Sequence, residues 1–103
     1  MELPLQITVR GFPHSRRLDA AIRRKAAKLE RLQPRLTSCR VVIDLPSRHK
    51  HQGREFVVRL DLRMPGTELA INRDHHEDPY VAMRDAFDAA MRKLGDRRRR
   101  RAP

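Results

Sequence analysis

Hydrophobic and polar positions alternate along four short segments of the chain, which are residues 5–10, 38–45, 54–64 and 68–72. An alternation of period two puts every second side chain on one face of an extended strand. Each segment is therefore predicted to be a half-buried β-strand. Pro65-Gly66 lies between the last two segments and predicts a tight hairpin there.

Hydrophobic residues recur every three or four positions from Arg16 to about Leu32, which is typical of an amphipathic helix. Ser15 is a suitable N-cap for this helix, and Pro34 follows its end. Lys25 is expected near the middle of the apolar arc, so its side chain must extend out at the rim or face a groove that is not fully closed. The predicted apolar face consists of Leu18, Ala21, Ile22, Ala26, Leu29 and Leu32.

A second helix is predicted after Asp78, whose carboxylate can accept hydrogen bonds from the free amides of the first turn. Pro79 fits the first helical position, where its missing N–H costs nothing. Gly95 is expected to stop the helix. The predicted buried stripe consists of Tyr80, Met83, Phe87, Ala90, Met91 and Leu94.

The predicted order of strand, helix, three strands and helix indicates an α+β fold, a two-layer sandwich. Three strands with short connections favour an antiparallel meander, and the first strand joins their sheet after a helical crossover. Both helices are expected on one face of the four-stranded sheet, which leaves arginines such as Arg40, Arg59 and Arg63 on the other. At 103 residues the chain fits one domain, assigned to residues 1–95, with a basic disordered tail at 96–103.

The strongest functional signal is charge, because 24 lysines and arginines outnumber 13 acidic residues and give a net charge of +11. A domain this basic normally binds a polyanion. A basic stripe on the first helix, formed by Arg17, Arg24, Lys28 and Arg31, can follow a phosphate backbone. With one tyrosine and three phenylalanines, stacking on unpaired bases is disfavoured, and recognition of folded RNA by shape and backbone fits better.

No catalytic or metal-binding pattern emerges. The cluster His49, His51, His75, His76, Glu77 and Asp78 lacks metal-ligand spacing. Cys39 faces the core in its predicted strand and is interpreted as a small buried hydrophobic residue. We therefore expect no enzyme activity, no cofactor, no metal and no small-molecule substrate. A single cysteine and the lack of a long apolar run favour a reduced, cytoplasmic setting without a membrane partner.

Several short segments in this order resemble the ribosome hibernation factor family, which comprises hibernation-promoting factor and ribosome-associated inhibitor A and was once labelled sigma-54 modulation proteins. The resemblance rests on residues 25–30, 41–43, the Pro65-Gly66 hairpin, Asp78-x-Tyr80-x-Ala82, Asp88 and 92–94. The chain departs from the family in having Ala89 at a usual lysine position, in Pro79 and in its arginine-rich end. By this resemblance we expect a short form of the family, without the C-terminal dimerisation domain of its long members.

This resemblance implies a β-α-β-β-β-α fold with the layout of double-stranded RNA-binding domains. It also implies a role in stress response or stationary phase, in which the protein binds in the decoding channel of the small subunit, blocks messenger and transfer RNA and keeps the whole ribosome idle. Off the ribosome a monomer is expected. By the family match Lys25, Lys28 and Arg92 contact ribosomal RNA. The full set of expected ribosomal RNA contacts is Arg17, Arg24, Lys25, Lys28, Arg31, Arg84, Arg92, Lys93, Arg97 and Arg98.

Two other functions stay open. A general basic binder of double-stranded RNA or DNA would bind naked duplex as tightly as ribosomes. A protein-interaction module that modulates transcription would need a protein partner and would tolerate loss of Lys25 and Lys28.

Overall fold

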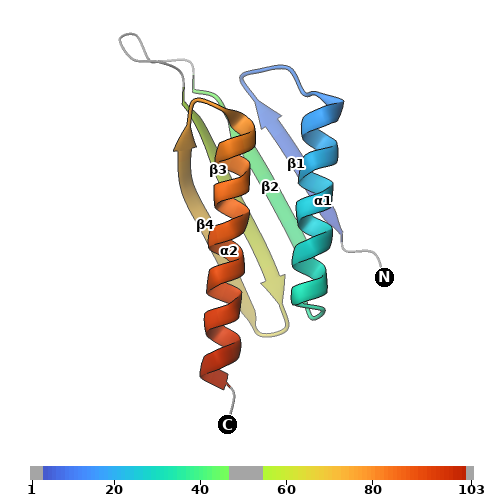
Figure 1. The fold of residues 1–103 in the computed structure, drawn as a ribbon. Helices are drawn as coiled ribbons and strands as arrows, with labels where there is room; N and C mark the ends of the chain where they lie inside the picture. The colour runs from blue at the N-terminus through green and yellow to red at the C-terminus, as the bar shows by residue number, and fades with distance from the viewer. Residues whose placement is uncertain (1–3, 47–54, 102–103) are drawn as a thin grey trace.

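Four strands and two helices make up the part of the protein that the structure describes (Figure 1). In this computed structural model, residues 4–46 and 55–101 are described. The elements are β1 (Leu5–Arg10), α1 (Arg16–Leu32), β2 (Ser38–Asp44), β3 (Phe56–Met64), β4 (Thr67–His76) and α2 (Pro79–Arg101).

The strands form one sheet in the order β1-β2-β3-β4. β1 pairs with β2 in parallel, as a helical crossover requires, and the other two pairs are antiparallel. Both helices lie on the same face of the sheet, side by side (Figure 1). The predicted two-layer α+β sandwich is thereby confirmed.

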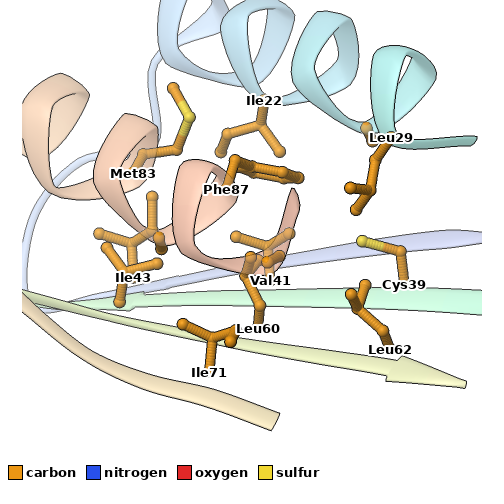
Figure 2. Packing of buried hydrophobic residues seen from close by; sticks show 14 of the residues in the cluster. Ile22, Leu29, Cys39, Val41, Ile43, Leu60, Leu62, Ile71, Met83 and Phe87 are labelled. Atoms are coloured by element: carbon orange, nitrogen blue, oxygen red, sulfur yellow. The ribbon is translucent and has the colours of Figure 1, made fainter. Parts of the chain in front are cut away.

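The core lies between the helix layer and the sheet (Figure 2). Phe87 of α2 is fully buried, and Ile22 and Leu29 of α1 are equally inaccessible to water. Burying side chains of this size stabilises the fold by about 1.5–3 kcal/mol each. The sheet contributes the inward residues of its strands, which include Cys39, Val41, Ile43, Val58, Leu60, Leu62 and Ile71.

Two side chains assigned to the core are instead exposed, Leu32 at 42% and Tyr80 at 36%. Leu32 is the last residue of α1 and Tyr80 the second of α2, so each has helical neighbours on one side only. Met91 and Ala21 are half-buried and pack against the core cluster. A periodic pattern therefore identified the buried face but not where along the helix burial fades.

Both predicted N-caps are confirmed. The Ser15 hydroxyl accepts a hydrogen bond from the Leu18 amide at 3.0 Å, and Asp78 Oδ1 accepts from the Tyr80 amide at 2.8 Å. The predicted stop at Gly95 is wrong, because α2 continues to Arg101. Glycine is permissive without being a helix breaker, and no proline lies between Gly95 and Arg101. The functional division between a domain at 1–95 and a tail at 96–103 stays a prediction.

The last strand is longer than predicted and runs over ten residues. A register shift between Val58 and Arg59 lets β3 and β4 stay paired beyond Asn72. Because the added residues are polar, hydrophobic alternation did not reveal them. At the other end of the hairpin, Gly66 has φ +73°, in agreement with the predicted turn.

Candidate nucleic-acid interface

The helix layer carries nearly all of the net charge. α1 holds seven basic and two acidic residues, and α2 holds eight basic and three acidic, so the two helices account for +10 of the total of +11. Both helices cover the same face of the sheet (Figure 1), so most of the net positive charge belongs to the helix layer. An electrostatic field of this kind steers a polyanion toward the helices.

The predicted stripe on α1 is present as a solvated edge of the helix. Arg17, Arg24, Lys28 and Arg31 are all exposed and fall within an arc of about 60° at 100° per residue. Within residues 4–46 and 55–101, none of these four side chains makes a hydrogen bond or ion pair. Their charges are available to an external anion.

Lys25 lies at the border between this stripe and the buried face, one turn before Lys28, and is half-buried. It too is without a partner among the described residues. A lysine in such a place packs its aliphatic stem against apolar neighbours and presents its amine at the rim. The rim position resolves the conflict between a lysine and the predicted apolar arc.

The opposite edge of α1 is neutralised within the protein. Arg23 Nε lies 2.7 Å from Asp19 Oδ2, and His14 Nε2 lies 3.3 Å from Asp19 Oδ1. The hydrogen bond from Arg23 holds the pKa of the Asp19 carboxyl below its usual value. The two edges of α1 therefore differ, one carrying free cations and the other an internal ion-pair cluster.

The expected contacts on α2 do not form one stripe. Arg84, Arg92 and Lys93 are exposed, and Arg84 pairs with Asp85 at 3.4 Å. At 100° per residue Arg92 lies about 80° around the helix from Arg84, and Lys93 about 180°. Arg97 and Arg98 continue the helix, and their side chains lie outside the described part of the structure.

The structure also groups arginines that the predicted contact set leaves out. Arg40, Arg59 and Arg63 line one hollow on the face of the sheet that the helices leave open. Their outward orientation follows from strand alternation and was predicted. Their proximity depends on strand register, which no sequence signal supplied.

The remaining chemistry is sparse. Cys39 is buried, and burial raises the pKa of its thiol to about 12, which disfavours the reactive thiolate. Over the described ranges, no three His, Cys, Asp or Glu side chains come together in a way that could hold a metal ion. Of the histidine-rich group that the sequence analysis did not favour as a metal site, His49 and His51 lie outside the described residues. In the same ranges no helix has the length and apolar character to cross a membrane.

The sequence matches one protein family over almost its whole length. The family model described as Sigma 54 modulation protein / S30EA ribosomal protein covers residues 5–102. The chain belongs to this family. Its membership in the S30EA family confirms the resemblance to ribosome hibernation factors that the sequence showed. No curated protein sequence matches the chain.

Solved structures agree with the S30EA assignment at the level of fold. A ribosomal subunit interface protein from Coxiella burnetii superposes with a TM-score of 0.79 at 12% identity, over 93% of this chain and 98% of that one. The N-terminal domain of Protein Y from Thermus thermophilus gives 0.71 at 20% identity, over 91% and 96%. The chain is thus a ribosome-associated family member with the fold of these proteins.

Proposed function

We propose that this protein is a translation inhibitor that binds the small ribosomal subunit in its decoding channel and keeps the ribosome idle. The proposal rests on the edge of α1 that carries cations unpaired among the described residues, in a chain of the S30EA family. This edge consists of Lys25 and the basic stripe of Arg17, Arg24, Lys28 and Arg31. In the channel the protein excludes messenger and transfer RNA by occupying their space. The mechanism needs no catalytic step and no cofactor.

Binding would rest on many exposed contacts to ribosomal RNA phosphates. Each contact displaces condensed counterions, so affinity falls steeply as salt rises. Free Lys25 and Lys28 gain more from an RNA phosphate than Arg23 does, because Arg23 already pairs with Asp19. We propose that the protein acts in the cytoplasm, in stress or stationary phase, and is a monomer off the ribosome.

The proposal is tested by sedimentation with isolated small subunits, large subunits and whole ribosomes, in the presence of excess naked duplex RNA. The informative variant is Lys25→Glu/Lys28→Glu. Its matched control is Arg16→Glu/Arg23→Glu, which makes the same change in charge on exposed positions of the same helix. Arg23 lies two residues from Lys25, about 200° around the helix.

We expect the wild type and the control to sediment with small subunits despite the duplex, to displace bound messenger, and to inhibit translation in vitro. The Lys25→Glu/Lys28→Glu variant should lose all three properties. Release by the duplex would instead identify a general double-stranded RNA binder. Equal behaviour of the two variants would favour a protein-interaction module and contradict the proposed contacts.

A further inference from the structure

The face of the sheet opposite the helices carries a hollow of about 810 Å³. Its walls include Gln6 of β1, Ser38 and Arg40 of β2, and Arg59, Asp61 and Arg63 of β3. These positions alternate with buried ones such as Cys39 and Leu62, so their side chains lie on the solvent face. The volume falls in the range of ligand-binding clefts.

Strand register places three arginines in a zigzag across this hollow. Arg40 lies directly opposite Asp61, and Ser38 lies directly opposite Arg63. Arg59 and Arg63 are therefore the two diagonal neighbours of Arg40, each about 7–8 Å away between Cα atoms. Arginine side chains are long enough to reach across that separation. Neighbouring guanidinium groups can therefore bind the same phosphate, or successive phosphates, of one nucleic-acid strand.

The three arginines differ in how their charge is used. Arg59 Nε lies 3.1 Å from Asp61 Oδ2, and Arg63 Nε lies 3.3 Å from Glu68 Oε2. Arg40 has no hydrogen-bonding or ion-pair partner within the described ranges. Both separations are longer than the 2.7 Å between Arg23 Nε and Asp19 Oδ2, and a long exposed ion pair is worth little, so a phosphate oxygen can replace either carboxylate.

We propose that this hollow is a second RNA-binding surface, which takes successive phosphates of a single RNA strand on Arg63, Arg40 and Arg59. The Ser38 hydroxyl opposite Arg63 adds a neutral donor of the kind that phosphate oxygens accept. No aromatic side chain lines the hollow, so the surface would contact the sugar-phosphate backbone of the RNA and not stack on its bases.

A phosphate strand fits this surface better than an acidic peptide does. A single carboxylate is satisfied by one planar guanidinium fork, whereas the hollow offers three guanidinium groups on diagonally neighbouring positions and a hydroxyl beside one of them. Asp61 and Glu68 lower the net charge of the face, so its affinity is weaker than that of the helix layer. With cations on both faces, the thin domain can lie between two RNA segments and hold them together.

The inference goes beyond the proposed ribosomal function and is tested without ribosomes. Oligouridylate is titrated into the isotope-labelled full chain, and backbone and arginine Nε signals are followed by NMR. In a Lys25→Gln/Lys28→Gln background, which weakens the helix surface, binding is measured at several salt concentrations with and without Arg40→Gln. Arg35→Gln serves as the matched control, since Arg35 is exposed in the connection between α1 and β2.

We expect shifts at Ser38, Arg40 and Arg63 on addition of oligouridylate, and at least a threefold loss of affinity with Arg40→Gln. The slope of log K against log salt should fall by about 0.7, the value for one lost phosphate contact on a single strand. Oligoadenylate should bind alike. Shifts confined to the helices would overturn the proposal, as would equal effects of Arg40→Gln and Arg35→Gln. Shifts in the hollow with polyglutamate but not with oligouridylate would overturn it in favour of an acidic protein partner.

Discussion

Two glycines hold positive φ angles for different reasons. Gly11 follows β1 with φ +83°, and a Cβ at this position would lie 2.3 Å from the carbonyl oxygen of Leu45. Gly66 has φ +73° in the β3–β4 turn, with open space around the same direction. Glycine is therefore required at position 11 by both the left-handed backbone conformation and the close approach of Leu45, whereas at position 66 it is required by the conformation alone.

Substitution by alanine separates the two requirements. Gly66→Ala should destabilise the protein by about 1–2 kcal/mol, the usual cost of a left-handed conformation for a residue with a Cβ. Gly11→Ala should cost distinctly more, because the contact is with backbone and must push β1 away from β2, where the Leu45 amide donates to Arg10 O at 2.9 Å. Urea denaturation measures both. Equal losses of stability would show that the backbone at the C-terminal end of β1 can move away from Leu45 without cost.

The buried thiol provides a probe of the core. Burial raises the pKa of Cys39 from an ordinary value of 9.0 to about 12, so at pH 8 the native protein holds about a thousandfold less thiolate than the unfolded chain. Because the folded pKa is the higher one, this preference stabilises the fold below pH 9 and is lost as the pH rises toward 12.

We therefore expect a disulfide reagent to label native Cys39 at least about a thousandfold more slowly than the guanidinium-denatured protein at pH 8. The single cysteine makes the readout unambiguous. Fast labelling of the native protein would mean that the inner face of β2 opens far more often than a packed core permits.

At the scale of the element, the N-cap of α1 can be tested directly. Removing the hydroxyl with Ser15→Ala leaves the Leu18 amide without its acceptor, and should cost about 1 kcal/mol. Ser15→Asp keeps an acceptor beside the positive end of the helix dipole, so it should match the wild type. Thermal unfolding followed by circular dichroism distinguishes them. An equal loss in both variants would show that the serine hydroxyl has a role beyond capping.

The helices and strands differ in how far the sequence predicts them. Arg16–Leu32 was predicted closely, because its cap, its periodicity and Pro34 all act within a few residues. The C-terminal end of α2 was not, since Gly95 signals a stop only when the chain turns left-handed there. β4 was shortened because its last residues are held by pairing with β3 and not by burial of an alternating face.

The placement of the candidate contact residues was predictable to the same degree as the helices and strands that carry them, whereas their role in binding stays a prediction. The stripe on α1 depends on spacing within one helix, so the helical period of 100° per residue correctly predicts that Arg17, Arg24 and Lys28 share one exposed edge. The division of α2, with Arg84 and Lys93 on opposite sides, follows from the same geometry. The hollow around Arg40 depends on which residues of β2 and β3 face each other, and long-range pairing of that kind leaves no local signal.

At the scale of the whole molecule, the net charge of +10 on the two helices allows two mechanisms for the proposed RNA binding, a general electrostatic field or defined contacts. Salt dependence separates them. Lys28→Gln and Arg23→Gln each remove one exposed charge from α1, but Lys28 is free and Arg23 pairs with Asp19. A general field would respond equally to both changes.

If Lys28 contacts a phosphate, Lys28→Gln should reduce the slope of log K against log salt by about 0.9 for helical RNA, treated like a DNA duplex. Arg23→Gln should leave the slope nearly unchanged, because that guanidinium is already engaged. Fluorescence anisotropy of the labelled protein, titrated with small subunits at five salt concentrations, gives both slopes. Matching reductions would mean that the helix layer attracts RNA through its overall charge, and that the free edge of α1 does not determine how the protein is oriented on the ribosome.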